Sequence, residues 1–341
     1  MTFSNLVFSR LSIKFTSLAG VAIAAALVAS SAYAQTSITF GHVGGPTSLF
    51  QVSAEHFAER ANERLADEAD GQYEVVVYHS SQLGNDSELL QKLRLGTVHL
   101  ALPSTIMSSV SDEFGLFELP YLVRDREHMK RIEEEIFWPT LNPLLEAQGF
   151  NVLAIWENGF RHITNNVRPV VEPGDLQGMK LRTPSGVWRI RMFEEYGASP
   201  SPMELSEVFM ALQTGVMDGQ ENPLAQIAGQ RFQEVQRYLS LTGHVYTPAY
   251  ITAGAAFNRL PENVQEILVE VARESQDFVY ETAAKMDEDL VDVIRQAGTE
   301  VNEADKDAFI EASRPIYDLF ADEVSGAQEL IDQAIALGQG S

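Results

Sequence analysis

Two arginines and an asparagine lie at predicted strand ends, where ligand-binding groups are often found in α/β proteins. Arg161 and Arg182 each lie at the end of an apolar, β-rich run, and Asn222 lies at a strand-to-helix junction. A guanidinium group presents a planar fork of N–H donors that matches a carboxylate, and its charge does not titrate away. Two such groups near one cleft would hold an organic acid. The chain also carries 48 acidic residues, so either arginine could instead pair with a structural carboxylate.

Asn222 has an ordinary explanation as well. It directly precedes Pro223, and asparagine is favoured as a helix N-cap while proline is favoured at the first helical position. We therefore expect Asn222 to cap a helix that runs to about Val235. The same amide could also face a ligand.

The elements around these residues alternate between strand and helix. Residues 180–224 are predicted to form strand, helix, strand, helix and strand, followed by the helix at Asn222. In open α/β sheets ligands bind beyond the carboxyl ends of the strands. Near the N-terminus, strands at 37–43 and 73–79 flank an amphipathic helix at 48–69, which predicts a βαβ unit and a parallel sheet. The segment 264–294 carries one long helical stripe, and further helices are predicted at 304–319 and 327–337.

Two β-rich runs, 152–163 and 245–257, are long enough to cross between domains. We place the first crossing near Asn158 and the second near the start of the later run. The prediction is a two-domain α/β fold with hinge strands and a long C-terminal helix that braces both domains. Domain I would comprise residues 35–158 and 248–287, and domain II residues 159–247 and 288–341.

The first 34 residues are typical of a secretory signal peptide. Arg10 and Lys14 precede a short apolar run at 18–29, and an A-x-A site ends at Ala34. Cleavage between Ala34 and Gln35 would release an exported, periplasmic protein; an uncleaved anchor is the alternative. The formal net charge of −24 argues against nucleic acid or an anionic membrane as a partner, and the absence of cysteine excludes disulfides and thiol chemistry.

Patterns for catalysis or cofactor binding are missing from the sequence. The seven histidines show no metal-ligand spacing, and there is no G-x-S-x-G elbow. The glycine-rich segment 41–45 lacks both the dinucleotide fingerprint and the P-loop lysine, so we interpret it as a turn that brings backbone close to the cleft. No metal and no cofactor are predicted.

Several motifs, taken in order, are similar to one known family. They are SSQLGNDSELLQKLRLGTVHLAL from Ser80, FELPYLV from Phe117, WENGFR from Trp156, LQGMKLRTP ending at Pro184, and GASPSPMELSEVFMALQTGVMDGQENPL ending at Leu224. Together they resemble the solute-binding proteins of tripartite ATP-independent periplasmic (TRAP) transporters, DctP type, over essentially the whole mature chain. The resemblance implies a Venus-flytrap fold that closes around an organic acid and delivers it to a membrane permease.

The resemblance also implies roles for individual residues. Arg182 would bind the ligand carboxylate, with Arg161 and Asn222 beside it. Positions that vary with substrate in the family extend the predicted ligand site, and they are Val43, Ser104, Ser185, Leu205 and His244. Trp156 is included as a residue that could form a wall of the pocket, the alternative being that it packs in the core. The protein would act as a monomer and not as an enzyme, on a sugar acid or a C4-type dicarboxylate. The alternatives are an aromatic or other monocarboxylate, a sensor as the partner, and an exported enzyme on the same scaffold.

Overall fold

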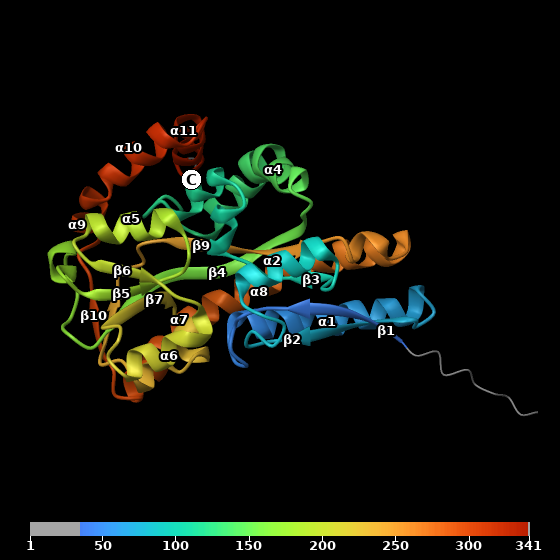
Figure 1. Cartoon of the computed structure of the whole chain (residues 1–341), viewed down its shortest axis with the longest axis horizontal. Helices are drawn as coiled ribbons and strands as arrows, with labels where there is room; N and C mark the ends of the chain where they lie inside the picture. Colours follow the sequence, from blue (N-terminus) through green and yellow to red (C-terminus); the bar gives the residue numbers. More distant parts are fainter. Residues whose placement is uncertain (1–34, 340–341) are drawn as a thin grey trace, which may run out of the picture. The chain divides into compact units, whose positions relative to one another are not determined.

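The fold is a mixed α/β sheet with many helices, seen here in a computed structural model that describes residues 35–339 (Figure 1). The predicted signal peptide and its cleavage site lie outside these residues. The main path of the sheet runs β2-β1-β3-β9-β4-β7-β5-β6, and β8 and β10 extend it from β4. This architecture is the predicted two-domain, periplasmic-binding-protein type.

The strands fall into two groups, which we call lobe 1 and lobe 2. Lobe 1 holds β1 (Thr36–Gly41), β2 (Tyr73–Tyr78), β3 (Leu100–Ala101) and β9 (Tyr246–Ala253). Lobe 2 holds β5 (Lys180–Thr183), β6 (Ser199–Pro202), β7 (Gly219–Pro223), β8 (Tyr238–Leu241) and β10 (Glu300–Glu303). The predicted parallel β1–β2 pair is present, with α1 between them in the chain.

One long strand, β4 (Asn151–Asn165), belongs to both lobes. It pairs with β9 from Asn151 to Phe160 and with β7 from Arg161 to Asn165. The change of partner between Phe160 and Arg161 follows an irregularity at Glu157 to Gly159. The exact domain boundaries stay a prediction.

Helices cover both lobes. The α-helices are α1 (Leu49–Glu68), α2 (Asp86–Leu95), α3 (Arg126–Ile132), α4 (Asn142–Ala147), α5 (Val187–Glu195), α6 (Leu205–Gln213), α7 (Leu224–Gly229), α8 (Glu262–Gln296), α9 (Lys306–Ala312), α10 (Arg314–Glu323) and α11 (Ala327–Leu337). The other helical turns are η1 (Thr105–Ser109), η2 (Asp112–Glu118), the π-helical η3 (Glu133–Leu141), η4 (Pro173–Leu176), η5 (Phe232–Glu234) and η6 (Phe257–Arg259).

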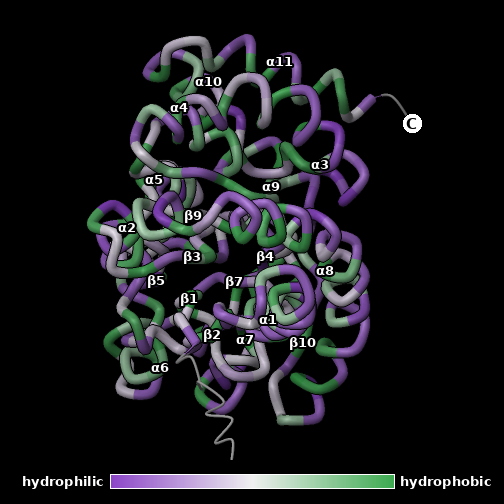
Figure 2. The backbone as a smooth tube through the Cα atoms, turned by 90° about the vertical axis from the view of Figure 1, so that its right-hand side faces the viewer, coloured by the Kyte–Doolittle hydropathy of each residue, from purple (hydrophilic) through white to green (hydrophobic). Residues whose placement is uncertain are grey.

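The helix α8 is the predicted bracing helix. Its buried residues recur every three or four positions, as at Val264, Leu268 and Val271, which gives it one apolar face. This helix contacts α1 beside lobe 1 and α7 beside lobe 2. Figure 2 shows apolar and polar residues alternating along α1 and α8, as expected for helices that lie on a core.

Several details differ from the sequence prediction. Asn222 lies inside β7 and does not cap a helix, because α7 begins at Leu224 after Pro223 and has no side-chain cap; this helix also ends at Gly229, well before Val235. Pairing of β7 with β4 extends through Pro223, so tertiary strand pairing outweighs the local Asn-Pro preference. The paired strands β8 and β10 were not predicted, and the helix predicted at 304–319 is divided into α9 and α10.

A close backbone contact joins the turn after β1 in lobe 1 to α7 in lobe 2. The turn after β1 brings Gly45 against Gly229 at the end of α7, and a Cβ atom on Gly45 would overlap the Gly229 carbonyl oxygen. Next to this contact, the Gln230 amide donates to the Val43 carbonyl oxygen at 3.3 Å. The predicted glycine-rich turn therefore lies where the two lobes meet.

Candidate functional site

A cavity of about 50 Å³ lies between the two lobes. Lobe 1 and its connections contribute Val43, Phe50, Asp86, Ser104, Thr105 and Ile106 to its wall. The strand β4 contributes Asn158 and Arg161, and lobe 2 contributes Arg182, Pro184, Ser185, Met203, Glu204, Leu205, Asn222 and Gln226. Seven of the predicted site residues are thus brought together, namely Val43, Arg161, Arg182, Ser104, Ser185, Leu205 and Asn222.

Arg182 is the one arginine of this wall whose charge is not paired within the described residues. It lies near the end of β5, and its Nε and one terminal nitrogen donate to the Met203 carbonyl oxygen at 2.9 and 2.5 Å. Only 3% of the residue is exposed. Burial lowers the pKa of Arg182 to about 10, so it still carries its charge at neutral pH. The carboxylates of Glu221, Asp86 and Glu204 offset part of the cost of burying this charge. None of them forms an ion pair with Arg182 in the described structure, so a ligand carboxylate at bonding distance would relieve the remaining cost.

Arg161 differs because its charge is already matched. Its Nε lies 2.5 Å from Glu221 Oε2, and a terminal nitrogen lies 2.9 Å from Glu221 Oε1. The same nitrogen donates to Asn222 Oδ1 at 3.1 Å. Of the two roles that the sequence left open for Arg161, pairing with a structural carboxylate is present, although the residue also borders the cavity.

Glu221 is the centre of a buried charge network. Arg189 on α5 approaches Glu221 Oε2 at 2.8 Å and Glu118 on η2 at 3.0 Å. His244 Nε2 lies 3.1 Å from the same Glu221 oxygen. Burial alone would raise the pKa of Glu221, but Arg161, Arg189 and His244 together hold that pKa well below its usual range. The network therefore fixes Arg161 and the β7 backbone that carries Asn222.

His244 is predicted to be neutral in the folded protein. Burial lowers its pKa to about 4, against the opposing effect of Glu221. To approach the Glu221 carboxylate, Nε2 must carry the proton, and Nδ1 then accepts from the Thr242 hydroxyl at 2.8 Å.

Acidification should therefore destabilise the protein through His244. The pKa of this histidine is 6.5 in the unfolded chain and about 4 in the folded chain. The free energy of unfolding therefore falls as the pH drops from about 6.5 to about 4. Between pH 7.5 and pH 5 we expect His244 to account for a loss of about 2 kcal/mol. Urea titrations at both pH values should show a smaller loss for His244→Gln than for the wild type. Parallel pH profiles of the two proteins would contradict a neutral His244.

The polar side chains around the cavity are oriented by one another. The Ser104 hydroxyl donates to the Pro248 carbonyl oxygen at 2.6 Å and accepts from Asn158 Nδ2 at 3.2 Å. Asn222 Nδ2 donates to Gln220 Oε1 at 2.5 Å. These bonds give the amides fixed directions before any ligand arrives.

Two acidic residues of the wall were missed in the sequence. Asp86 is the first residue of α2, after Asn85, whose side chain caps that helix, and Glu204 directly precedes α6. Within residues 35–339 neither carboxylate has an ion pair or a side-chain hydrogen bond. Both stand at strand-to-helix connections, which is the signal that could have identified them.

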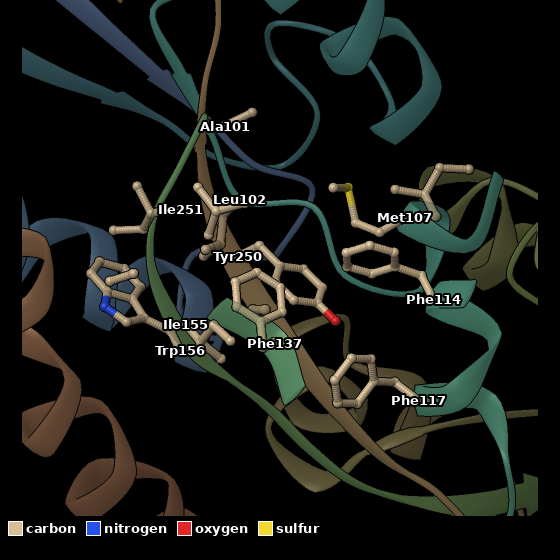
Figure 3. Packing of buried hydrophobic residues seen from close by; sticks show 14 of the residues in the cluster. Ala101, Leu102, Met107, Phe114, Phe117, Phe137, Ile155, Trp156, Tyr250 and Ile251 are labelled. Carbon is tan, nitrogen blue, oxygen red and sulfur yellow. The ribbon is translucent and has the colours of Figure 1, made fainter. Parts of the chain in front are cut away.

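Trp156 and His244 do not border this cavity. Trp156 is fully buried, donates from its indole to the Ala272 carbonyl oxygen at 2.9 Å, and packs edge-on against Phe57. Figure 3 shows Trp156 and Ile251 on one side of the paired strands, with Phe114 and Phe117 on the other. The structure therefore corrects both predicted placements: Trp156 belongs to the hydrophobic core, and His244 lies behind the cavity in the charge network.

A larger groove of about 1010 Å³ lies on the other face of β4. Phe160 and His162 border that groove, whereas the intervening Arg161 borders the cavity, because successive side chains of a strand point to opposite faces. The groove contains neither Arg182 nor Asn222. The cavity between the lobes is therefore the candidate ligand site.

Residues 35–339 were also searched for other kinds of site. They include no group of three or more His, Cys, Asp or Glu side chains arranged to hold a metal ion. In the same part of the chain, no helix combines the length and the apolarity needed to cross a bilayer.

Comparison with known proteins gives consistent matches along the chain. Residues 40–323 match the family of bacterial extracellular solute-binding proteins, family 7. The 2,3-diketo-L-gulonate-binding periplasmic protein YiaO of Escherichia coli K12 is 32% identical over 310 residues, covering 90% of this chain and 93% of that protein. The C4-dicarboxylate-binding periplasmic protein DctP of Rhodobacter capsulatus is 32% identical over 300 residues, covering 86% and 88%.

A solved structure agrees with the fold. A TRAP periplasmic solute-binding protein of Polaromonas sp. JS666, bound to D-erythronate, has a TM-score of 0.83 and 30% identity, and the match covers 89% of this chain and 99% of that one. The family and these neighbours are binding proteins. The chain belongs to the family 7 extracellular solute-binding proteins, the DctP family of TRAP solute-binding proteins.

Proposed function

We propose that this protein is a periplasmic receptor that captures an organic acid through Arg182 and delivers it to the permease of a TRAP transporter. The observation that carries the proposal is Arg182 itself, a buried cation that borders the cavity between the lobes and has no ion pair among the described residues. A ligand carboxylate would be its counter-ion. The relatives named above are described as binding a sugar acid or a C4-dicarboxylate, and these are the substrate classes we propose.

The geometry supports a closure mechanism. In an open form Arg182 would be hydrated, and a carboxylate would dock on its guanidinium fork. Closure then brings Gly45 against Gly229. It also removes the ion pair from water, and the attraction strengthens because the effective dielectric constant of the closed site is lower. Closure without an anion leaves Arg182 buried and unpaired, so the closed form is favoured when ligand is present. A membrane partner could read this shape as a report of occupancy.

The finer points of the proposal concern organisation and location. Domain I would comprise residues 35–158 and 248–287, and domain II residues 159–247 and 288–341. Export would follow cleavage between Ala34 and Gln35, and the mature protein would act as a monomer without catalysing a reaction. N-terminal sequencing of the secreted protein and light scattering test these statements.

Thermal unfolding with a panel of organic acids tests the central proposal. A ligand present at 100 times its Kd stabilises the folded state by about 2.7 kcal/mol. We expect at least one sugar acid or dicarboxylate to raise the Tm by several degrees, and its uncharged polyol analogue to have no effect. The proposal fails if no acid stabilises the protein, or if mass spectrometry shows that the bound acid is converted to a product, which would indicate an enzyme.

A further inference from the structure

The cavity wall has more acidic side chains than basic side chains that lack an ion pair. Among the described residues, Arg182 is the cavity cation without an ion pair, because Arg161 is paired with Glu221. Two carboxyl groups, those of Asp86 and Glu204, face the same space. A ligand carboxylate on Arg182 therefore satisfies the available positive charge. A second ligand carboxylate would meet like charge in a cavity of about 50 Å³, where repulsion is screened less than in bulk water.

Asp86 is only partly ionised near neutral pH, so it can present either a carboxylate or a protonated carboxyl group to a ligand, and Glu204 supplies the larger share of the negative charge. Burial, and then the charge of Glu204, raises the pKa of Asp86 to about 7 despite the opposing effect of Arg182. Burial also raises the pKa of Glu204. The two residues come from opposite lobes, one at the start of α2 and one just before α6, so closure itself brings them together.

Two neutral side chains of the cavity present unpaired acceptors, beside the Ser185 and Thr105 hydroxyls, which can donate or accept. The Ser104 hydroxyl gives its proton to the Pro248 carbonyl oxygen, so it can only accept from Asn158. The Asn158 amide nitrogen therefore faces Ser104, and its Oδ1, buried and without a partner in the described structure, is left as an acceptor. Gln226 Oε1 is likewise buried without a partner among these residues. Asn158 is 6% exposed and Gln226 is 3% exposed, so unmet acceptors here are costly.

We infer, on the basis of the receptor function proposed above, that the ligand is a polyhydroxylated acid with a single carboxylate, and that Asp86 and Glu204 select it against dicarboxylates. Each acceptor comes from a different element: Asp86 from α2, Asn158 from β4, Glu204 from the turn before α6, and Gln226 from α7. Hydroxyl groups spaced along a carbon chain can donate to acceptors on several walls. A single ammonium group concentrates its donors at one point and suits this arrangement less well.

Calorimetry with acids of matched length tests the inference. The pair D-erythronate and tartrate compares one carboxylate with two on a four-carbon hydroxylated chain, succinate removes the hydroxyl groups, and threonine supplies an ammonium group. We expect erythronate or a longer aldonate such as galactonate to bind at least about tenfold more tightly than tartrate and succinate. Glu204→Gln and Asp86→Asn should each reduce the ratio of the tartrate Kd to the erythronate Kd by several-fold. Glu207→Gln is the matched control, since Glu207 is exposed on α6 and does not border the cavity.

The outcomes separate this inference from the receptor function. If no acid binds, the receptor function itself fails. If acids bind in a manner that depends on Arg182, but tartrate or succinate binds as well as the hydroxylated monocarboxylates, the receptor function stands and the inference is overturned. A preference for threonine, or an erythronate-to-tartrate ratio unchanged in both cavity variants, also overturns it.

Discussion

Replacing Arg182 with alanine is expected to weaken binding of the organic acid by a few hundred-fold or more. The side chain is 3% exposed and bonds only to the Met203 carbonyl oxygen within the described residues. Leaving one member of a buried ion pair without its partner costs about 3–5 kcal/mol, which corresponds to that loss of affinity. Titration calorimetry with the best acid from the thermal screen measures the effect directly. Affinity close to that of the wild type would remove Arg182 from the site.

Two further measurements separate binding from folding. Without ligand, Arg182→Ala should be about as stable as the wild type, because the substitution removes a buried charge that has no ion pair in residues 35–339. A large drop in the ligand-free Tm would instead indicate a structural role. Arg182→Lys should also bind weakly, because an ammonium group cannot form the planar two-pronged contact. As a control, Arg231→Ala removes an exposed arginine that pairs with Glu234 and should leave affinity unchanged.

Of the single substitutions proposed for this protein, Glu221→Gln should give the largest loss of folding stability. The Glu221 carboxylate pairs with Arg161 and Arg189 and contacts His244, and all of these side chains are buried. Glutamine keeps the shape but removes the negative charge, so the guanidinium groups are left facing each other with only Glu118 to offset them. We expect the free energy of unfolding to fall by about 3–5 kcal/mol.

Urea denaturation of Glu221→Gln beside Glu234→Gln is the appropriate measurement. Glu234 forms an exposed pair with Arg231, in which the side chains are 42% and 69% exposed, and its loss should cost less than about 1 kcal/mol. If the two variants lose similar stability, the network around Glu221 does not stabilise the fold as described. Glu221→Gln should also weaken ligand binding moderately, because it loosens the β7 segment that positions Asn222.

The parts of the site that were predictable from sequence are those that depend on residue type and local position. Arg182 and Arg161 were found because a guanidinium at a strand end is visible in a short segment. The pairing of Arg161 was not predictable in the same way. Its partner Glu221 lies 60 residues further along the chain and is one of 48 acidic residues. Only strand pairing between β4 and β7 makes that choice.

The fold was predictable from the sequence to a similar extent. The βαβ unit at the N-terminus and the long helix α8 follow from clear periodicity. Asn222 was misassigned as a helix cap because the Asn-Pro pair has a strong local preference, whereas pairing with β4 keeps these residues in a strand. Trp156 was included in the ligand site because a tryptophan could form a pocket wall, but the alternation of β4 directs it into the core against Phe57. In both cases the outcome depends on a neighbour that is distant in sequence.

In the proposed closure, the contact between Gly45 and Gly229 would set a fixed end point. Backbone atoms cannot change rotamer, so the separation of the lobes at this contact does not adjust to the ligand as a side-chain contact would. On this proposal, an acid that fits would allow the same final geometry whatever its affinity, whereas one that is too long would hold the glycines apart and leave Arg182 accessible to water. The length of the acid would then decide whether the lobes close, independently of how tightly it binds. Any partner that recognises the closed surface would meet one shape for every acid that is accepted.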